Sequence, residues 1–201
     1  MAAVSRTVAV EGLVDKAVAK KMVSYIGASC LRVCGLKGRD QIRRKIAGYN
    51  NAARLAPWLV LVDLDRCQCA PKLKGKWLPA PTPYMCFRVA VRTIEAWLLA
   101  DAKNFARFFN IPERLLPSHP KSVSDPKHLI VTLAKQSRKR DIREGLVPAD
   151  SSGVVGPRYT TLLSEFASAF GDIRAACRRS PSLQRAVRCL KTVLGAYGRS
   201  T

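Results

Sequence analysis

Acidic residues follow two apolar runs of the sequence, in places where carboxylates could do chemistry. Glu11 comes directly after Thr7 to Val10, and Asp63 and Asp65 follow Trp58 to Val62. Carboxylate oxygens are preferred ligands of Mg²⁺, and a metal bound by them polarises phosphoryl oxygens and activates water. The two clusters therefore predict a divalent metal site that handles phosphates.

The spacing of Asp63 and Asp65 bears on whether they act together. If the preceding strand continues through them, residues two apart project from the same face. An isolated Asp-x-Asp pair is weak evidence, because acidic residues also cap helices and end strands. Glu11, at the end of a neighbouring predicted strand, adds a third carboxylate. The repulsion among three carboxylates is costly unless a cation or a base offsets it.

Alternating strand and helix patterns place these carboxylates at one edge of a sheet. The predicted strands are Thr7 to Val10, Cys30 to Leu36, Trp58 to Val62 and Met85 to Val91, and the predicted helices are Val14 to Tyr25, Gln41 to Leu55 and one opening at Ile94. This order implies a parallel sheet with right-handed crossovers. Ligand sites in such sheets lie beyond the carboxyl ends of the strands, where Glu11 and Asp63 fall.

The charge of the chain indicates a polyanionic partner. Lys and Arg number 35 against 14 Asp and Glu, which gives a net charge of +21. A positive field of this size attracts nucleic acid, the leading partner class. The alternative is a generally basic protein from a GC-rich genome, in which codon usage enriches Arg and Ala.

Five basic residues in two segments could contact a phosphate backbone. They are Arg43 and Arg44 on the predicted helix Gln41 to Leu55, and Lys72, Lys74 and Lys76 in a predicted Gly- and Pro-rich loop. Taken singly, each is expected on a solvated face. As a set they favour a clamp, because the lysines directly follow the predicted metal ligands, where nucleic acid would have to pass.

Cysteine usage and hydropathy predict a cytoplasmic protein without a membrane segment. The chain has seven cysteines, an odd number, and Met1 to Val10 shows no charged-then-apolar leader, so we expect reduced thiols. The paired Cys-x-x-Cys motifs of zinc sites are absent. The longest apolar stretch is interrupted by Asp63 and Asp65 and is too short to cross a bilayer.

Several motifs, in this order, resemble those of TOPRIM domains, which occur in topoisomerases, primases and OLD-family nucleases. Val10-Glu11-Gly12 with Asp15 at a helix start, and later Val62-Asp63-Leu64-Asp65, are similar to the two acidic TOPRIM motifs. Further runs resemble a compact bacterial TOPRIM-like family of unknown function: Ile94 to Asp101, Asp125 to Lys127, Val155 to Tyr159 and Arg179 to Leu183. The resemblance covers nearly the whole chain, and order and spacing carry its specificity.

The resemblance implies a role for each matching residue. Glu11 would act as a general acid or base or as a metal ligand, Asp63 and Asp65 would hold Mg²⁺ or Mn²⁺, and Glu95 and Lys127 match the downstream acidic group and the assisting lysine of OLD-type nucleases. Glu95 has a structural alternative, since an acidic residue in a first helical turn complements the helix dipole. Asp15 and Asp101 are expected to have structural roles at helix ends. Cys67 stands where many TOPRIM domains carry a third aspartate.

The expected architecture is an α/β fold, with a TOPRIM-like Rossmannoid parallel sheet flanked by helices and a mainly helical C-terminal extension. Residues 1–101 would form the catalytic core, and residues 102–201 the extension packed on it within one structural domain.

The function implied by the resemblance is a magnesium-dependent nuclease in defence against phage or other mobile DNA. Because the sequence contains no Gly-x-x-x-x-Gly-Lys-Ser/Thr loop, a separate ATPase subunit would supply any ATP-driven step. The alternative is a non-catalytic basic subunit that binds nucleic acid for such a system.

Overall fold

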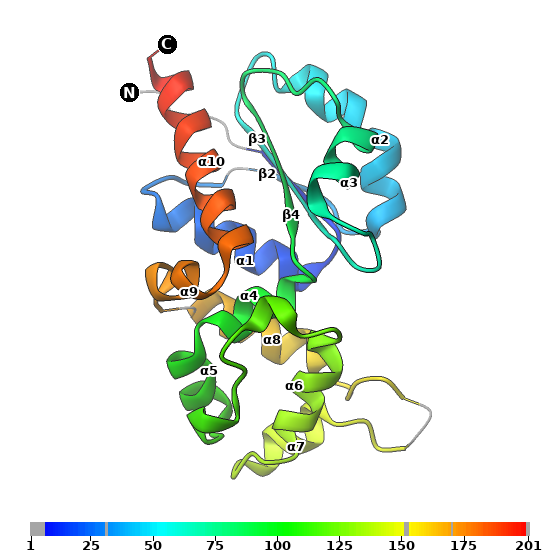
Figure 1. Ribbon diagram of the computed structural model, residues 1–201, viewed down its shortest axis with the longest axis vertical. Coiled ribbons are helices and arrows are strands. Elements are labelled where there is room, and N and C mark those ends of the chain that lie inside the picture. The colour runs from blue at the N-terminus through cyan, green and yellow to red at the C-terminus, as the bar shows by residue number, and fades with distance from the viewer. Residues whose placement is uncertain (1–6, 31, 151–152, 170, 200–201) are drawn as a thin grey trace.

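Four parallel strands form the centre of the molecule (Figure 1). The computed structural model describes residues 7–30, 32–150, 153–169 and 171–199. The sheet order is β2-β1-β3-β4, with β1 at Thr7–Val10, β2 at Arg32–Gly35, β3 at Trp58–Asp63 and β4 at Met85–Ala90. The predicted α/β class with a parallel sheet is confirmed. Some residues of the predictions lie outside the described residues. They are residues 1–6, where no leader was expected, Leu31 of the second predicted strand, and residues 151–152, 170 and 200–201 of the predicted extension.

Helices connect the strands and make up most of the described chain after them. The helices between strands are α1 (Leu13–Tyr25), α2 (Arg39–Ala52) and α3 (Ala70–Trp77). Those after β4 are α4 (Ile94–Ala100), α5 (Ala102–Phe109), the short 3₁₀ helices η1 (Glu113–Leu115) and η2 (Pro120–Ser122), α6 (Pro126–Ala134), α7 (Arg140–Leu146), α8 (Tyr159–Ala169), α9 (Ile173–Arg179) and α10 (Pro181–Gly198). None of the described helices is long and apolar enough to span a membrane.

The segment that carries Lys72, Lys74 and Lys76 is the helix α3, so the predicted loop is wrong. Pro71 stands in the first turn, where a missing backbone N–H removes no intrahelical hydrogen bond. The apolar side chains of Leu73 and Trp77 are four residues apart and pack together against the sheet. This packing outweighs the poor helix propensity of Gly75, which suggested a loop.

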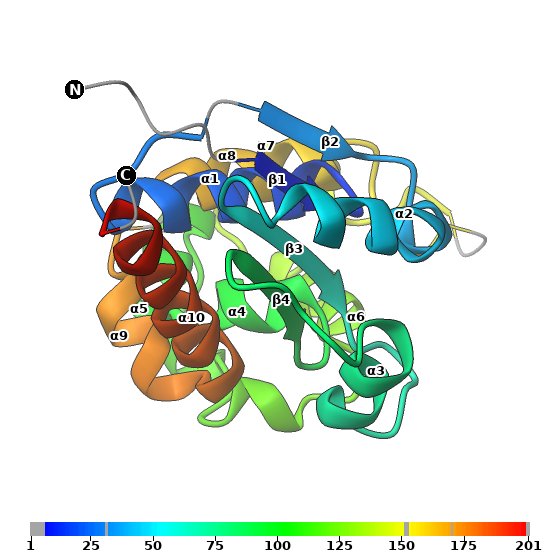
Figure 2. The same cartoon turned by 90° about the horizontal axis from the view of Figure 1, so that it is seen from above.

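The two faces of the sheet are covered by different helices. Figure 2 shows α2 and α3 on one side of the sheet and α4 and α10 on the other. Val60 of β3 belongs to a core shared with Ile42 of α2, whereas Leu61 belongs to a larger core shared with α1, α4 and the C-terminal helices. This larger core crosses position 101, since Phe105 of α5 is part of it together with Trp97 of α4.

Ser182 of α10 supports Trp97 of α4 in this core. Trp97 Nε1 donates to Ser182 Oγ at 2.7 Å, and both residues are buried. In a Ser182→Ala variant the indole N–H loses its acceptor, so urea denaturation should show a free energy of unfolding lower by about 1–3 kcal/mol. Ser168→Ala is the control, because the Ser168 hydroxyl is exposed on α8. An equal effect in both variants would contradict the role of this hydrogen bond.

Candidate functional site

A pair of hydrogen bonds joins the carboxyl ends of β1 and β3 to the start of α4. The backbone N–H of Asp63 donates to Glu11 Oε1 at 2.9 Å, and the N–H of Ile94 donates to Asp63 Oδ1 at 2.8 Å. Glu11 directly follows β1, which lies beside β3 in the sheet. The parallel register therefore brings the Glu11 and Asp63 carboxylates together at the carboxyl ends of the strands, the edge of the sheet that was predicted from the sequence.

Two further carboxylates reach this edge from the first turns of α1 and α4. Asp15 is 7% exposed and Glu95 is 6% exposed. The Tyr159 hydroxyl donates to Glu95 Oε1 at 3.4 Å, whereas Asp15 Oδ1 is buried without a hydrogen-bond partner. We refer to Glu11, Asp15, Asp63 and Glu95 as the acid cluster.

Burial and mutual repulsion raise pKa values within the acid cluster. Burial, and after it the charges of Glu11 and Glu95, raise the pKa of Asp15 to about 7. The pKa of Asp63 is raised well above its ordinary value, again by burial first and then by its acidic neighbours. Burial also raises the pKa of Glu11, although the hydrogen bond from the Asp63 N–H opposes the rise. The ion pairs found in the described part of the chain do not reach these four carboxylates, so a bound cation would relieve their repulsion.

Asp65 leaves the strand and turns toward Arg39. β3 ends at Asp63, and Asp65 has a left-handed φ of 50°. Its carboxylate forms an ion pair with Arg39 at 2.6 Å. Arg39 also donates to the Asp63 carbonyl at 2.7 Å and lies 3.2 Å from Cys67 Sγ. Asp63 and Asp65 would project from the same face only if the strand continued through both. The chain turns after Asp63, so they do not.

The acid cluster suits a hard cation by the chemistry of its donors. All four side chains offer carboxylate oxygens, and Asp15 Oδ1 is buried with no partner. Within the residues that the structure describes, no three His, Cys, Asp or Glu side chains converge closely enough to hold an ion as they stand. Backbone N–H groups already occupy one oxygen each of Glu11 and Asp63. Binding of an ion would therefore have to draw the carboxylates closer together.

A polar cleft of about 730 Å³ opens beside the acid cluster. Its lining residues are Arg39, Asp65, Arg66, Cys67, Arg92, Thr93, Ser124, Asp125, Pro126 and Lys127. Thr93 directly precedes α4, and its hydroxyl is buried without a hydrogen-bond partner. Lys127 reaches the cleft from α6 and faces the same space as Asp65. The four basic side chains of this cleft favour a phosphate or another anion.

A smaller groove of about 350 Å³ continues from the cleft, because Arg39 and Cys67 line both. Arg43, Lys72 and Lys76 also line this groove. Lys72 and Lys76 are four residues apart on α3 and so share a face. Arg44 and Lys74, which we grouped with them from the sequence, are not in its wall.

The structure changes the role expected for one of the two helix-end aspartates. The Asp101 carboxylate accepts from Asn104 Nδ2 at 2.9 Å and from the Asp172 N–H at 3.4 Å, contacts that suit the helix-end role expected for it. Asp15 instead belongs to the acid cluster. The signal was its position four residues after Glu11 in a first helical turn, because helical side chains point back toward the N-terminus. Arg39 and Arg92 had no signal in the sequence, and Tyr159 appeared there only as the last residue of the run Val155 to Tyr159, because the tertiary fold brings all three to this edge.

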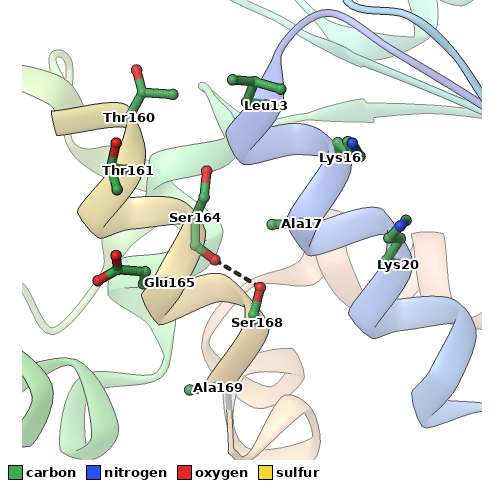
Figure 3. Close-up of a pocket in the computed structure, with 10 residues that line it drawn as sticks. All are labelled: Leu13, Lys16, Ala17, Lys20, Thr160, Thr161, Ser164, Glu165, Ser168 and Ala169. Carbon is green, nitrogen blue, oxygen red and sulfur yellow. Dashed lines mark hydrogen bonds between the residues drawn. The ribbon is translucent and has the colours of Figure 1, made fainter. Parts of the chain in front are cut away.

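Another groove contains none of the predicted site residues. It has a volume of about 770 Å³ and runs between α1 and α8, where Figure 3 shows Lys16 and Lys20 on one wall and Glu165 on the other. Ala17 and Ser168 also line it, and α1 packs on α8. The groove contains no member of the acid cluster, so we do not assign the chemistry to it.

Comparisons with known proteins do not identify a family for this chain. No model of a known protein family matches it, and no curated protein matches it either. Among solved structures, the chain is similar to the C-terminal region of the Burkholderia pseudomallei OLD protein, with a TM-score of 0.46 and 16% sequence identity over 96% of this chain and 98% of that one.

Proposed function

We propose that the protein is a magnesium-dependent nuclease with a TOPRIM-like catalytic core. The observation that carries the proposal is the acid cluster, four carboxylates that form no ion pair within the described residues, beside a cleft lined by basic side chains. Buried carboxylates of this kind call for a cation, and the basic cleft calls for an anion. A phosphodiester held next to a divalent metal satisfies both requirements.

The roles of the residues follow from their positions. Glu11 and Asp63, with Asp15 and Glu95 beside them, would hold Mg²⁺ or Mn²⁺, which supplies Lewis acidity toward a phosphoryl oxygen and activates water. The raised pKa of Glu11 suits a group that takes up and releases a proton during the reaction. Lys127, in the wall of the cleft, would stabilise the negative charge of the pentavalent phosphate. Asp65 would join the ligands only after leaving Arg39.

Metal binding and cleavage by the wild-type protein test this function directly. Calorimetric titration with Mg²⁺ and Mn²⁺ should show saturable binding, and DNA or RNA should be cut in the presence of metal and left intact with EDTA. If the wild-type protein neither binds a divalent metal nor cleaves nucleic acid, with or without a partner protein, the proposal is wrong. Salt-sensitive binding of nucleic acid in that case would favour the alternative, a non-catalytic nucleic-acid-binding subunit.

A partner ATPase and a role in defence against phage or mobile DNA extend this proposal. They rest on the resemblance to OLD-type nucleases and on the lack of a phosphate-binding Gly-x-x-x-x-Gly-Lys-Ser/Thr loop in the sequence. Co-expression with the product of the neighbouring gene, followed by a phage infection assay, tests both. Protection should require Asp63 in this protein and the ATPase site in the partner.

The smaller groove, lined by Arg43, Lys72 and Lys76 and called the basic groove below, should contribute to the affinity for nucleic acid rather than to the cleavage step. Replacing Arg43, Lys72 and Lys76 by glutamine should weaken nucleic-acid binding about tenfold or more at moderate salt. It should also lower the slope of log affinity against log salt by up to about three, because each lost phosphate contact removes roughly one released counterion. Arg44→Gln is the matched control, since Arg44 is on the same helix as Arg43 and outside the groove. An equal loss for Arg44→Gln would show that general charge, and not the groove, attracts the ligand.

A further inference from the structure

Two cysteines meet on the side of the sheet that faces α10. Cys86 is on β4, the strand at one edge of the sheet, and is fully buried. Cys189 is on α10, which packs along β4, and is only partly buried. Cys189 packs against the core that contains Cys86, where the two side chains interact, and both are free thiols.

Two cations flank this pair, and within the part of the chain that the structure describes neither has a carboxylate partner. Arg88, two residues after Cys86, lies on the same face of β4 and within hydrogen-bonding reach of Cys189. Its Nε is buried with no hydrogen-bond partner. Lys74 approaches from α3, on the side of the helix opposite the basic groove, and is partly buried. No ion pair among the described residues involves either side chain, so the Cys189 sulfur is the group that they are placed to stabilise as a thiolate.

The effect on the thiol follows from these contacts. The hydrogen bond from Cys86 and the charges of Arg88 and Lys74 lower the pKa of Cys189 to about 7, although burial opposes them. Cys177 on α9 provides the contrast within the chain, because burial raises the pKa of its thiol. At neutral pH much of Cys189 is therefore thiolate, the form that reacts.

We propose that Cys189 and Cys86 form a peroxide-reactive dithiol that closes to a disulfide between α10 and β4. The Cys189 thiolate attacks one oxygen of a hydroperoxide, so that an S–O bond forms, the O–O bond breaks and the alcohol or water leaves after taking up a proton. Cys189, oxidised by two electrons, is now a sulfenic acid. The Cys86 sulfur then attacks it, the S–S bond forms, the S–O bond breaks and water leaves with the Cys86 proton. The site is separate from the acid cluster and does not depend on the proposed nuclease activity.

Peptide mapping of the full chain under non-reducing conditions tests this site. The reduced protein is treated with a small excess of hydrogen peroxide at pH 7.5, and remaining thiols are blocked before digestion. The expected product is a linked peptide pair that contains Cys86 and Cys189, with loss of two thiols out of seven. Without peroxide, iodoacetamide should label Cys189 about tenfold faster than Cys177, as its larger thiolate fraction predicts.

Two variants separate the attacking thiol from the resolving thiol. In Cys86→Ser the sulfenic acid of Cys189 should persist and be trapped by dimedone, whereas Cys189→Ser should form no linked pair and trap nothing. Cys177→Ser, on the neighbouring α9, should behave like wild type. If the Cys86 variant fails to fold, the mapping of wild type alone decides. Disulfides at Cys67 and Cys69 instead, or labelling at equal rates across the chain, would overturn the proposal.

Discussion

Asp63→Asn is expected to lower metal-dependent phosphodiester cleavage on the order of 10³-fold while the protein stays folded. Asparagine keeps an Oδ1 that can accept the Ile94 N–H, now at 2.8 Å from the aspartate, so the start of α4 should not change. What is lost is one charged ligand of the proposed metal, together with its share of charge stabilisation in the transition state. Single-turnover cleavage at saturating Mg²⁺ measures the effect on chemistry rather than on binding.

The free energy of unfolding of Asp63→Asn distinguishes loss of a metal ligand from loss of the folded structure. Because Asp63 is repelled by Asp15, Glu95 and Glu11, removing its charge should leave the free energy of unfolding unchanged or raise it at neutral pH. Lost activity with equal or greater stability is thus the expected signature. Asp141→Asn, an exposed position on α7, should keep full activity. Full activity in Asp63→Asn would remove Asp63 from the site.

Asp15→Asn should stabilise the metal-free protein by up to about 4 kcal/mol above pH 7. Each tenfold change in proton affinity is worth about 1.4 kcal/mol, and the folded state raises the pKa of Asp15 from 3.8 to about 7. As pH rises through 3.8, unfolded chains lose this proton before folded ones, so wild-type stability falls and the loss is complete above about pH 7. Asparagine has no proton to lose, and its advantage should vanish below about pH 4.

Urea denaturation of wild type and Asp15→Asn across this pH range measures the difference. Addition of Mg²⁺ should stabilise wild type more than the variant, because only wild type presents the fourth carboxylate to the ion. Glu113→Gln, an exposed acidic residue of η1, controls for net charge. A difference between wild type and Asp15→Asn that does not vary with pH would show that Asp15 is not held among repelling carboxylates.

The sequence predicts well the strands and helices that position Glu11 and Asp63, because these elements depend on local patterns. Short β-branched runs separated by helical periodicity indicate a parallel sheet, and such sheets place the residues after their strands at one edge. Glu11 and Asp63 follow directly from that rule. Asp65 does not, because its direction depends on a left-handed turn and on Arg39 from a helix more than twenty residues earlier.

Surface charge shows the same division. The five basic residues grouped by sequence are divided by helical geometry, since α3 points Lys72 and Lys76 into the groove and Lys74 toward Arg88 and the cysteines. A loop would have carried no such periodicity, and the packing of Leu73 and Trp77 decided in favour of the helix. The amino-acid composition therefore predicts that the surface charge is positive, but it does not predict where the basic side chains lie.

By itself, the sequence determined the sheet class, the end of the sheet at which Glu11 and Asp63 lie and the positive sign of the net charge. The resemblance to TOPRIM domains named Glu95 and Lys127 as candidates, and the tertiary structure shows where they lie, Glu95 in the acid cluster and Lys127 in the wall of the cleft. Only the tertiary structure shows that Asp15 joins the cluster and that Asp65 pairs with Arg39. The physical reason is distance along the chain. Strand order follows from local hydrophobic periodicity, whereas residues 15, 39, 63, 95 and 127 come to the same end of the sheet only once the helices pack on it.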